Sequence, residues 1–149
     1  MNIKIELLTY EKGIQSEQYI YELMRSLCSE YDEEYSINKT KEMISFLNDG
    51  SAIIAAAFRD DILIGYAWGY LRNTRCLRIH ITQLVVNEKY RSQGIGKRLL
   101  EFMEKQCLVR GCGGMELNVS ANNRGARQFY LNNDFVCESL FLAKRVKKE

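Results

Sequence analysis

The segment Gln83–Arg110 constrains the fold of this chain more strongly than any other part of the sequence. It begins with the apolar run Leu84–Val86, whose β-branched residues predict a buried strand. A polar stretch then leads to Gly94–Gly96, after which apolar side chains recur at helical spacing. The segment therefore predicts a strand, a glycine-containing turn and an amphipathic helix in direct succession.

The start of this helix favours the binding of an anion. The N–H groups of a first helical turn have no intrahelical partner, and the helix dipole adds roughly half a positive charge there. Glycine lets the main chain approach a ligand closely, and Arg91, Lys97 and Arg98 place cationic side chains nearby. These features indicate a phosphate or pyrophosphate site. The alternative is that the two glycines only ease the turn into the helix.

Spacing excludes two common phosphate-binding motifs. A dinucleotide fingerprint needs a third glycine where this chain has Leu99, and a Walker loop needs a glycine at Arg91 and a hydroxyl at Arg98. The remaining pattern, Arg91-x-x-Gly94-x-Gly96, resembles the pyrophosphate loop of the GCN5-related N-acetyltransferase (GNAT) superfamily. The resemblance implies that this loop and the preceding strand bind acetyl-CoA, through residues Leu84, Val85, Val86, Arg91, Ser92, Gln93, Gly94, Ile95, Gly96 and Lys97.

A second segment, Leu117–Phe135, is similar to the other signature of the same superfamily. That signature is a strand followed by an asparagine, a small residue, an aromatic–tyrosine pair and a closing phenylalanine. The resemblance implies that Asn123 contacts the pantetheine arm or the adenine nucleotide of the cofactor, and that Ala126 leaves room for it. It also places the hydroxyl of Tyr130 near the thioester sulfur, where a phenol can protonate the departing thiolate. Packing in the core is the alternative role of this tyrosine.

The sequence departs from the superfamily pattern at two positions. Asp134 stands just before the closing phenylalanine, where many members have a glycine, and aspartate tolerates a left-handed backbone better than most residues. Asn118 stands where members that acetylate protein N-termini often carry a glutamate base, and an asparagine cannot accept a proton. The second departure argues against protein N-termini as the substrate class.

His80 is the only histidine of the chain and a candidate catalytic base, because histidine side chains exchange protons near neutral pH. On a regularly alternating strand it shares a face with Thr82 and Leu84. A surface histidine without a catalytic role is the alternative, since a water chain or an amine that arrives neutral would serve as well. Trp68 and Tyr70 on the preceding strand either line the acceptor site or belong to the core.

Apolar periodicity predicts the helices and strands of the whole chain. The expected strands are Ile3–Leu7, Ser51–Phe58, Ile62–Leu71, Leu77–Val86, Met115–Val119 and two final strands near Phe135–Val146. The expected helices are Ser16–Tyr31, Lys39–Asn48, the helix after Gly94, and Asn123–Asn132. This order predicts an α/β fold that is antiparallel early and parallel across the central helix, because a strand–helix–strand unit crosses over in that way. The resemblance implies the GNAT (acyl-CoA N-acyltransferase) fold, a mixed, mostly antiparallel central sheet with a splayed central strand pair and helices on both faces.

Length and composition are those of a single domain spanning residues 1–149, which buries about 70% of the surface of its unfolded chain. The formal net charge is +2, too small to indicate nucleic acid or a membrane surface as a main partner. No apolar run approaches the ~20 residues that span a bilayer, and the N-terminus lacks a signal-peptide pattern, so a cytoplasmic location is expected. Five cysteines without a CxxC pair and a single histidine argue for reduced thiols and against a metal site.

The resemblance to the GNAT superfamily implies an enzyme that moves an acetyl group from acetyl-CoA to a primary amine by direct attack in a ternary complex. Backbone N–H groups at the splayed end of Leu84–Val86 would stabilise the oxyanion. The acceptor is a small molecule or a peptide, and the acidic segment Glu30–Glu34 either attracts it to an entrance that the resemblance places there or is a solvated loop. The alternative function is a non-catalytic acyl-CoA-binding sensor or interaction module. Superfamily members are often dimers, so a homodimer is one expected assembly.

Overall fold

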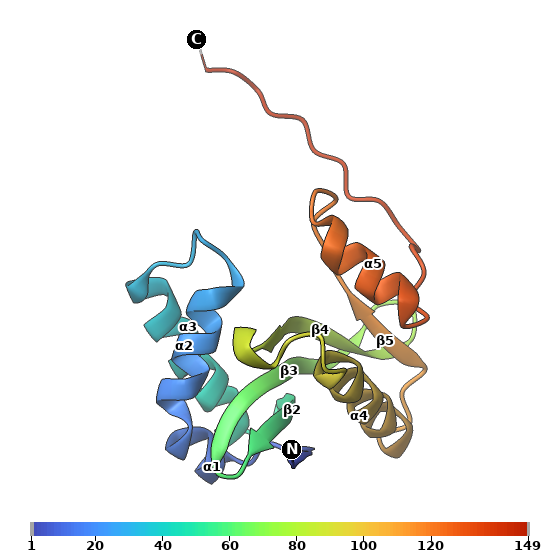
Figure 1. Ribbon diagram of the computed structural model, residues 1–149. Helices are drawn as coiled ribbons and strands as arrows, with labels where there is room; N and C mark the ends of the chain where they lie inside the picture. Colours follow the sequence, from blue (N-terminus) through green and yellow to red (C-terminus); the bar gives the residue numbers. More distant parts are fainter. Residues whose placement is uncertain (1, 149) are drawn as a thin grey trace. The chain divides into compact units, whose positions relative to one another are not determined.

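The computed structural model describes residues 2–148, which form a five-stranded sheet and several helices (Figure 1). Along the chain, helices connect some of the strands, and one helix follows the last strand. The strands are β1 (Ile3–Leu7), β2 (Ala52–Arg59), β3 (Ile62–Asn73), β4 (Leu77–Val86) and β5 (Gly114–Leu117). The helices are α1 (Tyr10–Gln15), α2 (Glu17–Leu27), α3 (Glu33–Asn48), the 3-10 helix η1 (Glu88–Tyr90), α4 (Ile95–Val109) and α5 (Arg124–Asn132). These residues divide into two compact units, one ending at Asn118 and one beginning at Val119. A single domain over residues 1–149 stays a prediction.

The sheet is mixed and mostly antiparallel, as predicted. Its strand order is β1-β2-β3-β4-β5, and only the last pair, β4 with β5, is parallel. Helix α4 connects these two strands. A strand–helix–strand connection returns the chain to the end of the sheet where the first strand began, so the second strand runs in the same direction. The end of β4, the loop and the start of α4 thus form one continuous unit of the fold.

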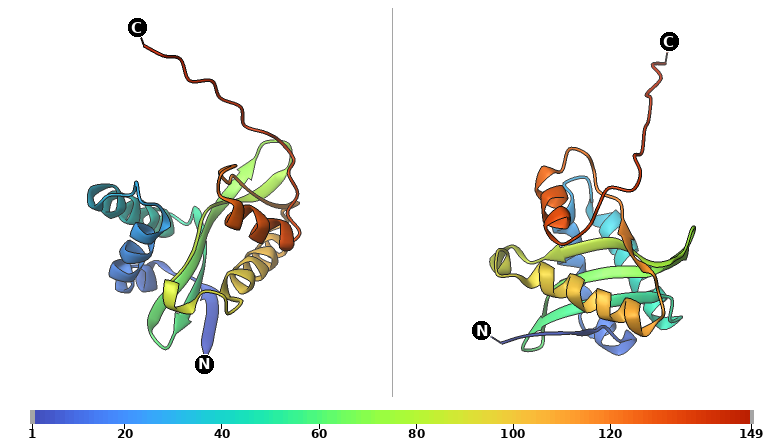
Figure 2. Two further views of the ribbon diagram at one scale, coloured as in Figure 1. Left: turned by 45° about the horizontal axis from the view of Figure 1, so that its top comes forward. Right: turned by 90° about the vertical axis from the view of Figure 1, so that its right-hand side faces the viewer.

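Helices cover both faces of the sheet. On one face, buried residues of α2 and α3 such as Met24 and Met43 form a core with Tyr66, Trp68 and Val85 of the strands. On the other face lies α4, and Figure 2 shows it on the side of the sheet opposite to α1, α2 and α3. Packing there is close, since a Cβ added at Gly69 would lie 3.0 Å from the Met103 methyl group. The α/β architecture with helices on both faces is therefore confirmed.

A β-bulge interrupts the alternation of β4. Trp68 of β3 pairs with Gln83, but Gly69 pairs with Ile81, so Thr82 is an extra residue on the β4 side. The Thr82 hydroxyl donates a hydrogen bond to the Trp68 carbonyl oxygen over 2.9 Å, which holds the bulge in place. His80 was expected to share a face with Thr82 and Leu84. The register instead places His80 on the face of Gln83, opposite to Leu84, and Thr82 is the residue left without a partner on β3.

The first helices differ from the predicted bounds because of their capping residues. The predicted helix Ser16–Tyr31 is shorter at its C-terminal end, since α2 ends at Leu27. The predicted helix Lys39–Asn48 begins earlier, at Glu33, because the Asp32 side chain accepts a hydrogen bond of 2.7 Å from the Tyr35 N–H. Most of the acidic segment is thus a cap and a first helical turn, where negative charge is favourable.

The C-terminal unit contains α5 and an extended chain without regular secondary structure after it. The prediction of two strands near Phe135–Val146 is wrong for the described residues. The apolar side chains that motivated it are solvent-exposed, 74% for Val136, 95% for Phe141 and 86% for Leu142. A strand exists only as part of a hydrogen-bonded ladder, and an apolar pattern does not by itself provide the neighbouring strand.

Candidate active site

The loop after β4 is stabilised by short-range hydrogen bonds. The Asn87 side chain accepts a bond of 3.0 Å from the Lys89 N–H and so caps η1. The Arg91 side chain returns to the strand end, where its Nε donates to the Val86 carbonyl oxygen over 3.0 Å. This bond uses one nitrogen of the guanidinium, so the other two remain as donors for an anion.

Gly94 places the open end of α4 at this loop. It is the N-cap residue of the helix, with a left-handed φ of +78°, and a Cβ added to it would meet no atom within 4 Å. The Arg98 N–H donates to the Gly94 carbonyl oxygen, so the N–H groups of residues 95–97 precede the first intrahelical bond. Ile95 is 2% exposed and anchors the turn in the core. The geometry is that of an anion site at a helix N-terminus.

The cations near this turn have different roles. Arg98 donates to the Ile3 carbonyl oxygen over 2.9 Å, so its guanidinium ties α4 to β1. Lys97 is exposed. Ser92 also has a left-handed backbone, with a φ of +63°. The predicted loop residues, Arg91, Ser92, Gln93, Gly94, Ile95, Gly96 and Lys97, are therefore brought together around the start of α4.

The parallel pairing of β4 with β5 ends before the loop. It runs from Arg78 with Gly114 to Ile81 with Leu117. Within residues 2–148, the pairing with β5 does not extend to Leu84–Val86, although those residues remain paired with β3. One edge of this part of β4 thus has backbone groups that β5 does not engage, as a ligand site there requires. That the two strands splay to admit an acyl chain stays a prediction.

The residues of the second signature belong to the C-terminal unit. Asn123 is the N-cap of α5, and its side-chain oxygen accepts a hydrogen bond of 3.1 Å from the Ala126 N–H. The amide nitrogen of Asn123 remains as a donor for a ligand. Ala126, in the same helical turn, is partly buried.

Tyr130 lies in the second half of α5, between two aromatic rings. The centroids of Phe129 and Phe135 each lie 5.4 Å from that of Tyr130, in edge-on arrangements. Burial raises the pKa of the Tyr130 hydroxyl above its ordinary value of 10.0. The phenol therefore holds its proton at neutral pH, which is the state that a proton donor requires.

The end of α5 explains the spacing between Tyr130 and Phe135. The Phe135 N–H donates to the Tyr130 carbonyl oxygen, and the Asp134 N–H donates to the Leu131 carbonyl oxygen. This pair of bonds is a Schellman motif, which requires a left-handed residue before its last member. Asp134 takes that conformation with a φ of +69°, at the position where many superfamily members have glycine.

His80 is buried and paired, unlike a surface histidine. Its Nδ1 lies 2.7 Å from a carboxylate oxygen of Glu116 and 3.4 Å from a guanidinium nitrogen of Arg72. Glu116 and Arg72 were absent from the sequence prediction. The parallel register pairs Glu116 directly with His80, a relation between two strands that the local pattern of neither strand reveals.

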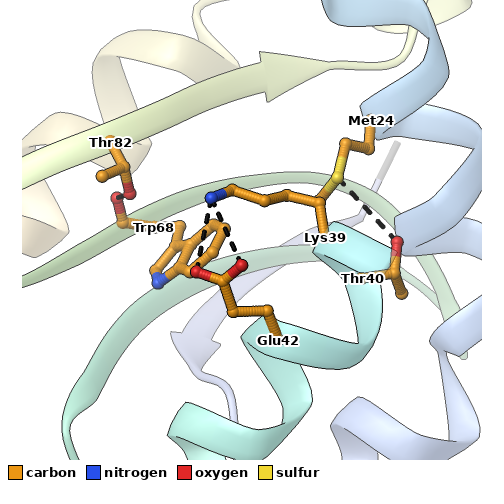
Figure 3. A network of polar contacts seen from close by, with 6 residues as sticks. All are labelled: Met24, Lys39, Thr40, Glu42, Trp68 and Thr82. Atoms are coloured by element: carbon orange, nitrogen blue, oxygen red, sulfur yellow. Dashed lines mark hydrogen bonds and ion pairs between the residues drawn. The ribbon is translucent and has the colours of Figure 1, made fainter. Parts of the chain in front are cut away.

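The two aromatic residues of β3 have different environments. Trp68 is 3% exposed and belongs to the core, so it does not line an open site. Figure 3 shows Lys39 of α3 beside the indole ring, with its ammonium group 5.7 Å from the ring centroid and paired with Glu42. Tyr70 is 37% exposed, and its ring centroid lies 5.4 Å from that of His80.

The acidic start of α3 borders a shallow pocket of about 450 Å³. Asp32, Glu33 and Glu34 line it together with Ile37 and Asn38. The lining combines negative charge with one apolar side chain, a composition that suits a cationic organic ligand.

The candidate residues form two groups that lie in different units. The cofactor loop, Leu84–Val86 and His80 belong to the N-terminal unit, whereas Asn123, Ala126 and Tyr130 belong to the C-terminal unit. That both groups bind one cofactor stays a prediction. Within residues 2–148, no cluster of three or more His, Cys, Asp or Glu side chains suited to a metal ion is present. The helices described in this range are also too short or too polar to cross a membrane.

The sequence matches a known protein family over most of its length. Residues 18–135 match the model of the acetyltransferase (GNAT) family. A comparison with curated proteins gives no match.

Several solved structures share the fold at low sequence identity. The aminoglycoside N-acetyltransferase AAC(6')-Iy in complex with CoA aligns with a TM-score of 0.79 and 15% identity, covering 99% of this chain and 96% of that one. An aminoglycoside acetyltransferase from an uncultured soil metagenomic sample, in complex with sisomicin, aligns with a TM-score of 0.80 and 17% identity, covering 99% and 97%. A transcriptional regulator from Bacillus halodurans aligns with a TM-score of 0.77 and 17% identity, covering 97% and 100%.

Proposed function

The chain belongs to the acetyltransferase (GNAT) family, and on that premise we propose that it transfers an acetyl group from acetyl-CoA to a primary amine. The observation that carries the proposal is the open N-terminus of α4. There Gly94 has a left-handed backbone and the Arg91 side chain is held at the end of β4. The pyrophosphate of acetyl-CoA would accept hydrogen bonds from the N–H groups of residues 95–97 and from Arg91. The CoA complex of a structural neighbour supports this choice of ligand.

The acetyl group would lie along the edge of β4 that β5 leaves unpaired. Asn123 and Ala126 would contact the pantetheine arm or the nucleotide, and Tyr130 would lie near the sulfur. In the ternary complex the amine nitrogen attacks the thioester carbon, and the carbonyl oxygen becomes an oxyanion stabilised by N–H groups near Leu84–Val86. Its collapse breaks the carbon–sulfur bond. The thiolate then takes the proton of Tyr130, and His80 takes the proton that the amine loses.

The acceptor would be a cationic small-molecule amine, with a peptide amine as the alternative. A structural neighbour in complex with sisomicin, described as an aminoglycoside acetyltransferase, supports a small-molecule acceptor. The pocket beside Asp32, Glu33 and Glu34 would concentrate such a cation through its negative charge. A homodimer and a cytoplasmic location remain expectations.

Release of free CoA thiol tests the proposal. The purified protein is incubated with acetyl-CoA and a panel of amines that includes aminoglycosides, polyamines and lysine peptides. We expect amine-dependent thiol release with at least one class. Calorimetric binding of acetyl-CoA without thiol release for any amine would instead identify the acyl-CoA-binding sensor or interaction module, and absence of binding would contradict both functions.

A further inference from the structure

We propose that Glu116 is a positioning residue that holds His80 in the tautomer with its proton on Nδ1, leaving Nε2 to accept the proton of the acceptor amine. The inference rests on the proposed transfer reaction and assigns the atom that performs one of its steps. Glu116 acts only through His80 and has no contact with the substrate in this proposal.

The distance between the two side chains decides the tautomer. A carboxylate oxygen is an acceptor only, and it lies 2.7 Å from His80 Nδ1. Two acceptors at that distance would repel, so the neutral imidazole must carry its proton on Nδ1 and donate it to Glu116. The lone pair of the ring then lies on Nε2.

Arg72 pairs with the same carboxylate and does not change this assignment. Its guanidinium nitrogen lies 3.5 Å from the same Glu116 oxygen, as an ion pair. It also lies 3.4 Å from His80 Nδ1, but a guanidinium is only a donor and would need an unprotonated Nδ1. His80 Nδ1 lies 0.7 Å closer to the carboxylate oxygen than to the Arg72 nitrogen. Because the closer group is a hydrogen-bond acceptor, Glu116 determines the position of the proton.

The bulge at Thr82 places this pair on the face of the sheet that carries Trp68 and that α2 and α3 cover. His80 pairs with Tyr70 of β3 and with Glu116 of β5, and residues directly opposite each other in a sheet point to the same face. Because of the bulge, Gln83 lies on this face too. Its side-chain oxygen accepts a hydrogen bond of 2.8 Å from the Tyr66 hydroxyl. His80 is the member of this row that can take a proton, through the lone pair on Nε2.

The single histidine allows a direct test by NMR. In protein labelled with ¹⁵N, the ring of His80 gives the only histidine signals, and long-range ¹H–¹⁵N correlation spectra distinguish the two neutral tautomers. We expect the Nδ1–H form in the wild-type protein at a pH where the ring is neutral. Glu116→Leu removes the acceptor oxygens and leaves an apolar side chain, and we expect the Nε2–H form to appear. An Nε2–H tautomer in the wild-type protein would overturn the inference, whether or not the protein turns over.

Kinetics of three variants separate positioning from a purely structural cross-link. Glu116→Leu should lower kcat for amine acetylation about tenfold or more with an unchanged KM for acetyl-CoA, as expected when a base is misoriented. Glu116→Gln keeps an acceptor oxygen and should restore the Nδ1–H tautomer and most of kcat. Glu6→Leu removes an ion-paired carboxylate from the opposite edge strand and should change neither the tautomer of His80 nor kcat.

The outcomes distinguish this inference from the proposed function. A wild-type kcat in Glu116→Leu, with its tautomer changed, would overturn the positioning role while leaving acetyl transfer intact. A wild-type protein that shows no thiol release with any amine overturns the proposed function and with it the catalytic role of His80. If Glu116→Leu does not fold, a Glu116→Gln variant with lost tautomer preference and unchanged kcat contradicts the inference in the same way.

Discussion

Two regions of this protein carry equally clear apolar patterns, yet only one of them has the predicted structure. In α4, the residues at helical spacing are buried, with Leu99 and Met103 at 0% exposure. In the segment Phe135–Val146, which was predicted as strands, Phe141 and Leu142 are almost fully exposed. A helix satisfies its own backbone hydrogen bonds, whereas a strand depends on a neighbour. The comparison shows that periodicity specifies which face of a segment is apolar, and that a partner determines whether this face is buried.

The largest expected effect comes from truncating an apolar side chain in α4, compared with the same kind of change in the C-terminal segment. Leu99→Ala should lower the free energy of unfolding by about 2–5 kcal/mol, because it leaves a cavity under α4. Phe141→Ala removes a larger side chain but should cost less than about 0.5 kcal/mol, because that ring is 95% exposed. Urea denaturation of both variants measures the difference. A large loss in Phe141→Ala would show that the C-terminal segment is packed in solution.

Gly94→Val tests the start of α4 as the pyrophosphate site. A branched side chain there should weaken acetyl-CoA binding about 100-fold, equivalent to the loss of one or two charge-assisted hydrogen bonds. Calorimetry measures the affinity.

The matched control for Gly94→Val is Gly50→Val. Gly50 has a φ of +80°, nearly that of Gly94, and its Cβ position is equally open. Both substitutions therefore introduce the same backbone strain, and only Gly94→Val should affect binding. Equal affinities in the two variants would place the cofactor elsewhere.

Tyr130→Phe asks whether the aromatic cluster of the C-terminal unit has a chemical role in addition to packing. The substitution keeps the ring between its two phenylalanine neighbours and removes the proton. We expect kcat to fall about 100-fold with unchanged affinity for acetyl-CoA. Tyr10→Phe, at an exposed tyrosine of α1, is the control and should be neutral. Turnover at the wild-type rate in Tyr130→Phe would leave packing as the only role of Tyr130.

The pH dependence of stability should also differ between the two units. Burial raises the pKa of Tyr66 and of Tyr130 above 10.0. Above that pH the unfolded chain loses protons that the folded chain keeps, so the free energy of unfolding should fall as pH rises. Each tyrosine can lower the free energy of unfolding by at most about 1.4 kcal/mol per pH unit. Because Tyr66 is fully buried, Tyr66→Phe should flatten this fall more than Tyr130→Phe in denaturation series above pH 10. Equal slopes in the two variants would contradict the difference in burial.

The smallest effect concerns the acidic start of α3. Glu33→Lys combined with Glu34→Lys should raise the KM for a cationic amine a few-fold at low salt, leave the KM for acetyl-CoA unchanged and reduce the salt dependence. Glu11→Lys combined with Asp61→Lys makes the same change in net charge at other exposed positions and is the control. An amine KM that does not respond at low ionic strength would leave Glu33 and Glu34 with no role beyond the first turn of α3.

Local sequence rules predicted the parts of the candidate site that depend on neighbours along the chain. The strand, the turn at Gly94 and the apolar face of α4 follow from side-chain type and spacing, and the structure contains all three. The left-handed backbone at Asp134 agrees with the resemblance, in which many superfamily members have glycine at this position. For the turn and the helix ends, the relevant hydrogen bonds join residues at most five positions apart.

The environment of His80 was decided only by the tertiary structure. The bulge at Thr82 reverses the face that simple alternation assigns, because a shift of one residue in a strand moves every later side chain to the other side. Glu116 reaches His80 across 36 positions of sequence, through the parallel register of β4 and β5. The register between β4 and β5 decides which of their residues lie opposite each other. This register depends on how α4, the helix that follows β4 and precedes β5 in the sequence, packs against the sheet. The sequence by itself thus determined the strand, the turn and the helix of the cofactor loop, whereas the pairing of strands determined which carboxylate His80 contacts.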